Sequence, residues 1–334
     1  MPVKPSPPHP IRVDLHGLTL TFHSDDPTLA ARFETVYGHL PRPQVTANGI
    51  NIHWQPLDAP AAPPPPPELP LLLEESLIGY YGDANRLAIR LPKYALLEVD
   101  FAAGRVSGQV TPACLSVYGV FEDVMMISLA PLYRRRGWFP LHAFAAQAPN
   151  GRAALITGGM GAGKTTTGLA LLCAGWKLLS NDSPLLRQGE SGVTVLAYPG
   201  QLSAFDDSLA RFEPLRRFVP GDAAAGAPRR EKRVFSAEEA FAQPWAGSAP
   251  AGGVFFPQVT PGLARSELEP LPPAEAVVQL LPQAIEGWDR AAIGRHLSLL
   301  TRLAESAPCY RLRLSPRVEQ LPGLILQGMQ AGPA

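Results

Sequence analysis

One short segment of the sequence carries glycines, a lysine and hydroxyl side chains at a spacing that suits phosphate chemistry. Residues 158–165 read Gly-Gly-Met-Gly-Ala-Gly-Lys-Thr and fit the P-loop pattern G-x-x-x-x-G-K-[ST] at every required position. Glycines let successive backbone N–H groups point at phosphate oxygens, and the helix that such a loop opens favours an anion at its N-terminus. In this pattern the ammonium group of Lys164 reaches the β- and γ-phosphates, and the hydroxyl of Thr165 binds Mg²⁺.

The segment therefore predicts a binding site for a nucleoside triphosphate, and the expected cofactors are ATP and Mg²⁺. The pattern by itself does not distinguish ATP from GTP. The residues expected to contact the nucleotide are Gly158, Gly159, Met160, Gly161, Ala162, Gly163, Lys164, Thr165 and Thr166.

The elements that must hold this loop can be read on both sides of it. An apolar strand at Ala153–Ile156 leads in, and a helix from Lys164 to Ala174 leads out. Asn150-Gly151 is a hairpin signal between that strand and an earlier one, which we expect to run unbroken from Phe139 to Gln147. Strands that alternate with helices predict an α/β domain over 131–334. Its later elements are expected as strands at 177–180, 194–198, 254–256 and 309–314 and helices near 274–283, 288–305 and 317–328.

Polar residues on two neighbouring segments can add chemistry to the loop. Asn181-Asp182 follows a short strand, and His142 lies within the expected strand before the hairpin. Asn-Asp-Ser-Pro is rich in turn formers, so Asp182 can be a simple cap. Its position after a strand that faces the loop favours a role in Mg²⁺ binding or as a base. His142 is either a hydrogen-bonded histidine of a core strand or a group that contacts phosphate or positions water.

Together these motifs resemble the HPr kinase/phosphorylase family, and specifically its kinase-like relatives. The close resemblance covers residues 138–190, and a weaker one extends through 198–200, 254–257 and 308–328. The residues that carry it are Leu141-His142-Ala143, the run from Ala154 to Thr167, Gly168-Leu-Ala-Leu-Leu, and Gly175-Trp-Lys-Leu-Leu-Ser-Asn181-Asp182. The resemblance implies a P-loop kinase domain related to phosphoenolpyruvate carboxykinase. It also implies transfer of the γ-phosphoryl group of ATP to a Ser hydroxyl on a small protein or peptide.

The residue roles that the resemblance implies depart from the family at one position. Lys164 and the loop N–H groups hold the phosphates, Thr165 holds Mg²⁺, and His142 lies next to the phosphate site. The family has an Asp pair whose first member is the general base, whereas this chain has Asn181 followed by Asp182. Because a neutral amide cannot accept the hydroxyl proton, either Asp182 is the base or Asp182 binds Mg²⁺ and the chemistry relies on positioning and charge.

Two other classes of function stay open at this point. One is a nucleotide-binding regulatory protein with weak or no transfer, which Asn181 favours. The other is a small-molecule kinase. The Asn-Lys-x-Asp motif of GTPases and the Leu-Ser-Gly-Gly-Gln signature of transport ATPases are both absent from the sequence.

The residues before 131 predict a separate α+β domain. Alternating apolar residues around His16-Gly17 indicate a hairpin at 11–22, and Asp26-Pro27 indicates the start of a helix. A run of five prolines lies in a proline-rich insertion at 56–70, which we expect to be a polyproline II spacer on the surface. The remaining expected elements are strands at 50–54, 77–81, 86–91, 95–101 and 106–110 and a helix at 121–136.

Two arginine-rich runs each have two interpretations. Arg134–Arg136 ends the expected helix, so it is either a solvated helix end or a patch near a phosphate site. The run 229–233, after an Ala/Gly/Pro loop, is either a solvent-exposed stretch or a mobile cover that brings a guanidinium to the γ-phosphate.

Composition excludes some partners. The 334 residues contain 29 Lys+Arg and 29 Asp+Glu, so no general basic field favours nucleic acid. No stretch approaches the roughly 18 apolar residues of a membrane span. The three cysteines show neither a disulfide framework nor metal-ligand spacing. We therefore expect a cytoplasmic protein that binds neither nucleic acid nor membrane, and the family resemblance adds a possible homo-oligomer.

Overall fold

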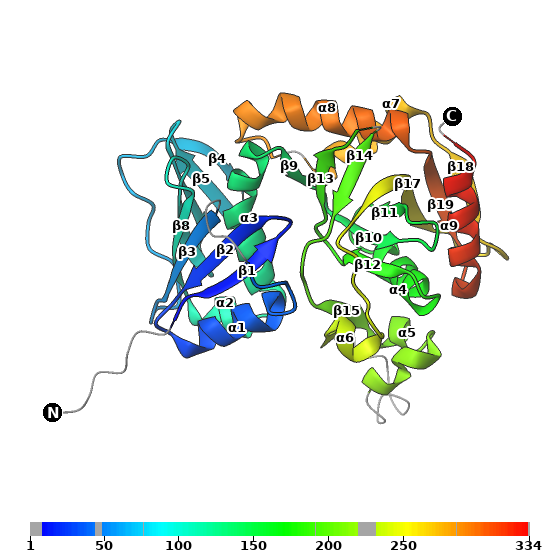
Figure 1. Cartoon of the computed structure of the whole chain (residues 1–334), viewed down its shortest axis with the longest axis horizontal. Coiled ribbons are helices and arrows are strands. Elements are labelled where there is room, and N and C mark those ends of the chain that lie inside the picture. Colours follow the sequence, from blue (N-terminus) through cyan, green and yellow to red (C-terminus); the bar gives the residue numbers. More distant parts are fainter. Residues whose placement is uncertain are drawn as a thin grey trace. The chain divides into compact units, whose positions relative to one another are not determined.

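The first part of the chain, Met1–Arg136, forms one unit together with the short later segment Glu286–Arg290. The computed structural model describes residues 9–43, 49–75, 77–190, 192–219, 232–284 and 286–332. Within them, eight strands of this unit make one sheet in the order β1-β2-β3-β8-β7-β6-β5-β4 (Figure 1). The strands are β1 (Ile11–Leu15), β2 (Leu18–His23), β3 (Gly49–Pro56), β4 (Leu71–Glu75), β5 (Ile78–Gly82), β6 (Arg86–Leu91), β7 (Ala95–Asp100) and β8 (Arg105–Val110).

The helices of this unit form where capping and apolar spacing favour them. The side chain of Asp26 accepts hydrogen bonds from the N–H groups of Thr28 and Leu29, both at 2.8 Å, and so caps α1 (Pro27–Tyr37). A short helix, α2 (Pro112–Ser116), leads to α3 (Val120–Arg135), which corresponds to the helix expected at 121–136. A domain boundary at 130/131 would cut α3, and the first unit instead runs on to Arg136.

The arginines at the end of α3 fit neither interpretation offered by the sequence. Arg134 is 2% exposed and pairs with Glu286 at 2.6 Å, and Arg135 pairs with Asp289 at 3.0 Å. The guanidinium of Arg134 also lies over the ring of Trp288. These side chains therefore hold the segment Glu286–Arg290 in the first unit. This role requires residues 152 to 155 positions apart in the chain to meet.

The proline-rich insertion packs against its own sheet rather than standing away from it. Ala62 and Leu69 are buried in a small cluster with Ala88 and Leu96. The side chain of Arg90 donates a hydrogen bond to the carbonyl of Pro63 at 2.9 Å. The five prolines themselves are exposed or half-buried, so the run lies on the surface as expected, but the apolar residues that flank it are covered and attach it to the sheet.

The second unit, Gly137–Ile285 with Ala291–Ala334, has a mixed α/β fold. Nine of its described strands form one sheet, in which β12-β10-β11-β17-β14-β13-β9 lie in order and β19 joins β17 to β18. Only the pairs β11–β17 and β17–β19 are parallel among these. The strands are β9 (Trp138–Pro140), β10 (Ala143–Gln147), β11 (Ala153–Thr157), β12 (Lys177–Ser180), β13 (Leu185–Gln188), β14 (Val193–Leu196), β17 (Ser248–Val259), β18 (Glu267–Pro270) and β19 (Cys309–Leu314).

Helices and a two-stranded ribbon complete the second unit. The ribbon pairs β15 (Leu202–Phe205) with β16 (Lys232–Phe235). The helices are α4 (Lys164–Cys173), α5 (Asp206–Leu209), α6 (Ala237–Ala240), α7 (Pro273–Leu280), α8 (Arg290–Ser306) and α9 (Leu321–Gln330), with short 3₁₀ turns η1 (Glu213–Phe218), η3 (Leu281–Gln283) and η4 (Val318–Gln320).

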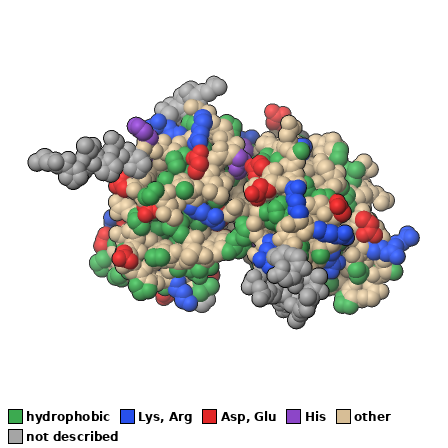
Figure 2. All heavy atoms as spheres, turned by 90° about the horizontal axis from the view of Figure 1, so that it is seen from below, with side chains coloured by type: hydrophobic (Ala, Val, Ile, Leu, Met, Phe, Trp, Pro, Cys, Tyr) green, Lys and Arg blue, Asp and Glu red, His purple; other side chains and the backbone are tan. Residues whose placement is uncertain are grey.

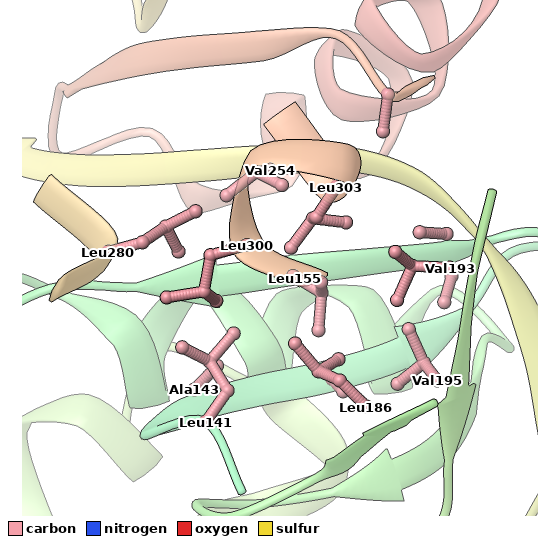
Figure 3. Packing of buried hydrophobic residues seen from close by; sticks show 14 of the residues in the cluster. Leu141, Ala143, Leu155, Leu186, Val193, Val195, Val254, Leu280, Leu300 and Leu303 are labelled. Atoms are coloured by element: carbon pink, nitrogen blue, oxygen red, sulfur yellow. The ribbon is translucent and has the colours of Figure 1, made fainter. Parts of the chain in front are cut away.

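Both faces of the central sheet are covered, which explains its apolar strand sequences. Leu155 of β11 lies in one core with Leu300 and Leu303 of α8, as Figure 3 shows. Its neighbour Ile156 points to the other face and packs in a second core with Leu169 of α4. Alternate residues of one strand therefore serve two helical layers.

The strand expected from Phe139 to Gln147 is in fact two strands. β9 pairs with β13 and β10 pairs with β11, so the chain changes partner at Leu141-His142. Continuous apolar character hid this break. Five strands were not predicted at all, namely β4, β13, β15, β16 and β18.

Charge is mixed on the surface. Figure 2 shows one face of the molecule, on which Lys and Arg side chains lie interspersed with Asp and Glu side chains. Among the residues that the structure describes, no helix is both long enough and apolar enough to cross a bilayer.

Candidate functional site

The glycine loop, residues 158–165, lies at an edge of the sheet where several strands end. β11 and β12 are both antiparallel to β10, so they point the same way, and β17 and β19 are parallel to β11. The carboxyl ends of these four strands therefore meet at one edge, together with the start of β10. In sheets of this kind, the crevice outside the carboxyl ends of the strands is the usual place for a ligand.

Backbone geometry shows why the loop needs its glycines. Gly158, Gly161 and Gly163 have φ values of 149°, 76° and 108°, which side chains with a Cβ rarely adopt. Gly163 caps the N-terminus of α4, whose first residue is Lys164. The ammonium group of Lys164 donates to the carbonyls of Gly158 at 2.6 Å and Gly159 at 3.3 Å, so the side chain folds back over its own loop.

Replacing Gly163 by Ala is expected to cost about 2–4 kcal/mol of folding stability, because positive φ and overpacking act together. A Cβ at this position would overlap the Cδ1 atom of Leu314 at the end of β19. Gly161→Ala is the matched control, since Gly161 also has positive φ but has no atom within 4 Å of an added Cβ. Urea unfolding of both variants measures the difference, and equal losses would show that Leu314 does not constrain the loop.

The electrostatic environment of Lys164 connects it to two charged residues. Burial lowers the pKa of Lys164 below its ordinary value, the nearby carboxylate of Asp182 acts to raise it, and Lys232 acts to lower it. Lys232 of β16 thus adds a second positive charge that acts on Lys164, although its own side chain is exposed. Positive charge of this kind favours the binding of a polyanion.

Asp182 and His142 form a pair beside the loop. The Nδ1 atom of His142 lies 3.2 Å from Oδ1 of Asp182, and their side chains are 43% and 46% exposed. Leu141 and Ala143 point into the core (Figure 3), whereas the intervening His142 is exposed. The N–H of Ala143 donates to the carbonyl of Asp182 at 2.8 Å, which fixes the two segments side by side. His142 is therefore half-exposed and not a core histidine.

Asn181 has a different environment from Asp182. Its side-chain amide donates to the carbonyl of Gln201 at 2.8 Å, and its Oδ1 atom lies against Gly200. The hydroxyl of Ser180 accepts from the N–H of Ser183 at 3.1 Å and shapes the turn that carries both residues. Asn181 thus holds the segment 200–201, while the carboxylate of Asp182 is directed at His142.

The sequence did not predict the elements that cover the N-terminus of α4. The hydroxyls of Thr166 and Ser208 lie 3.2 Å apart, which joins α4 to α5. Arg233 of β16 makes a two-pronged ion pair with Asp206, at 2.8 and 3.1 Å, and hydrogen bonding from Arg233 lowers the pKa of Asp206. Arg233 is thus structural. Residues 229–231 of the charge run lie outside the described residues, so the cover hypothesis stays a prediction.

The donor set at this edge fits Mg²⁺ and a polyphosphate. Mg²⁺ prefers oxygen ligands and usually takes one or two of them from the protein and the rest from phosphates and water. Thr165, at the first turn of α4, offers a hydroxyl, and Asp182 offers a carboxylate. Within the described parts of the chain, no group of three or more His, Cys, Asp or Glu side chains is arranged to hold a metal ion.

Comparison with known proteins gives little further information. No protein-family model matches the chain, and no curated protein matches it. A solved HPr(Ser) kinase/phosphatase from Coxiella burnetii is similar over 56% of this chain and 94% of its own, at 12% identity and a TM-score of 0.32. A similarity of this degree does not define an activity.

Proposed function

We propose that the second unit is a P-loop kinase that uses ATP and Mg²⁺ to phosphorylate a Ser hydroxyl of a small protein or peptide. One observation carries the proposal. The glycine loop with Lys164 and the exposed His142–Asp182 pair lie at the same edge of the sheet, close enough for the charge of Asp182 to act on Lys164. Phosphate binding and proton acceptance thus occur side by side, as phosphoryl transfer requires.

Each residue has one task in the proposed reaction. The loop N–H groups and Lys164 bind the phosphates, with the lysine exchanging its two loop carbonyls for phosphate oxygens. Mg²⁺, held by the hydroxyl of Thr165, would neutralise charge on the β- and γ-phosphates. The acceptor oxygen attacks the γ-phosphorus, the bond to the β–γ bridging oxygen breaks, and ADP leaves.

The hydroxyl proton passes to the carboxylate of Asp182, whose other partner, His142, keeps it oriented. A weak base suffices because the transition state for phosphoryl transfer is loose. The exposure of both side chains leaves room for a protein-borne hydroxyl to reach the carboxylate. Asn181 acts through position only, since its amide is engaged with Gln201.

The engagement of Asn181 also favours a second candidate function. The turn at Asn181-Asp182 offers one carboxylate where the resembled family has two. The competing proposal is therefore a regulatory protein that binds nucleotide and transfers no phosphoryl group. Incubation with γ-labelled ATP, Mg²⁺ and a dephosphorylated lysate of the host separates the two. A discrete labelled band supports the kinase, whereas tight ATP binding without label transfer supports the regulatory protein.

A further inference from the structure

Two histidines face each other on neighbouring strands of the first unit. β2 and β3 run parallel and side by side (Figure 1), with Phe22 opposite Ile52 and His23 opposite His53. Successive side chains of a strand point to opposite faces of the sheet. Because Phe22 and Ile52 are buried in the core, His23 and His53 lie on the other face, where His23 is half-buried and His53 is exposed.

The imidazole rings of these two histidines are stacked. Their centroids lie 4.1 Å apart and their planes differ by 4°. Neither ring makes a hydrogen bond or an ion pair with a described residue, so the lone-pair nitrogen of each neutral imidazole is free to bind a ligand. The ring separation is about twice the length of a metal–imidazole bond, roughly 2.0–2.1 Å, so small rotations of the two side chains can bring both rings to one ion.

The surroundings of His53 favour its metal-binding form. Burial lowers the pKa of His53 below its ordinary value, and the neighbouring His23 and Arg105 lower it further, so the neutral imidazole is favoured at neutral pH. The neutral form is the one that binds metal. Arg105 would repel a bound cation, but its guanidinium is paired with the carboxylate of Asp100 at 3.6 Å, which reduces that repulsion.

We propose that His23 and His53 together bind a divalent transition-metal ion of the kind that prefers imidazole, namely Cu²⁺, Ni²⁺ or Zn²⁺. Among the described residues, no third His, Cys, Asp or Glu side chain completes a group around the pair, so water or another small ligand fills the remaining positions. Mg²⁺ is a poor ligand for this site because it prefers oxygen donors. The proposal concerns the first unit alone and does not rest on the proposed kinase activity.

Calorimetric titration of the untagged chain with each metal ion, in a buffer that does not bind metals, tests the proposal. We expect the pair to bind one ion, with Cu²⁺ held more tightly than Ni²⁺ or Zn²⁺. His23→Gln and His53→Gln each remove one ligand, so each should lower the affinity by at least roughly 10- to 100-fold, the loss that follows removal of a mere partner of a ligand. His39→Gln is the matched control, because His39 is exposed in the same unit and lies outside the pair.

Unfolding in urea gives a second readout that does not depend on heats of binding. Without metal, the variant with both substitutions should unfold at the same urea concentration as the wild type, because both positions lie outside the core. With Cu²⁺ present, only the wild type and His39→Gln should gain stability, since an ion that binds the folded chain raises its free energy of unfolding. Unchanged affinity for all three ions in the doubly substituted variant, or an equal loss in His39→Gln, would overturn the proposal.

Discussion

Changing Lys164 to Met lowers the affinity for Mg²⁺–ATP by roughly 10- to 100-fold, the expected loss for a charge-assisted hydrogen bond of about 1.5–3 kcal/mol. Label transfer falls further, by roughly 10²–10³-fold, because the ammonium group also stabilises charge that develops on the transferred phosphoryl group. In the free protein this group donates to the carbonyls of Gly158 and Gly159, so it already lies at the loop that we propose as the phosphate site. Calorimetric titration and initial rates of labelling measure the two losses.

Lys164→Arg is the companion variant. It keeps the positive charge but replaces a compact ammonium with a planar fork. We expect it to recover part of the binding and little of the transfer. Unchanged ATP affinity in the Met variant would show that the loop does not hold the phosphates.

The free energy of unfolding of the wild type and of Lys164→Met, measured against pH, serves as a control. It shows whether the variant is folded and whether Lys164 is partly buried as described. Burial lowers the pKa of Lys164 in the folded chain, so the unfolded chain binds its proton more tightly. The cost of burying this charge is complete below the folded pKa and disappears as the pH rises toward the unfolded value, about 10.4. The wild type should therefore gain stability relative to the Met variant across that window. A parallel pair of curves would contradict the assigned environment.

Changing Asp182 to Asn should remove label transfer while leaving nucleotide bound. The substitution keeps the shape of the side chain and its neighbours but removes the proton acceptor that faces His142 at 3.2 Å. A positioned general base contributes about 10²–10⁴-fold, so the labelling rate should fall by that factor. ATP affinity, measured by the same titration as for Lys164, should change much less, because the loop and Lys164 remain in place.

A swap variant, Asn181→Asp with Asp182→Asn, keeps the net charge of the turn and moves the carboxylate by one residue. We expect no recovery of transfer. The side chain at position 181 faces the carbonyl of Gln201, and a carboxylate there would meet a second acceptor. Recovery in the swap variant, or full transfer by Asp182→Asn alone, would rule out Asp182 as the base.

The glycine loop and its flanking elements were readable from the sequence because their determinants are local. The spacing of glycines, Lys164 and Thr165 lies within one loop, and the apolar strand and helix that flank it were predicted close to their observed limits. The first unit shows the same pattern, in that the hairpin β1–β2 and the cap at Asp26 each depend on a few adjacent residues. Local rules of turn and cap chemistry suffice for such features.

Features that depend on distant partners were not readable. The ribbon β15–β16 pairs Leu202–Phe205 with Lys232–Phe235 across 27 to 33 positions, and neither strand shows a strong alternation of its own. The break between β9 and β10 at His142 cannot be seen in the sequence. Leu141 and Ala143 are apolar in either case, whether one strand or two strands contain them. A cavity of about 260 Å³ beside the glycine loop is lined by residues of α4, α5, β17, β19 and η4, so no single stretch of sequence signals it.

The segment Glu286–Arg290 limits where the chain can be cut into fragments for expression. It belongs to the first unit although it lies deep within the coding sequence of the second, so the polypeptide passes between the units three times. A fragment that ends at residue 136 would keep Arg134 but lose both of its ion-pair partners, Glu286 and Asp289, and the ring of Trp288 under its guanidinium. A cut at residue 136 therefore separates the first unit from its own segment Glu286–Arg290, which a fragment that starts at residue 137 would carry instead.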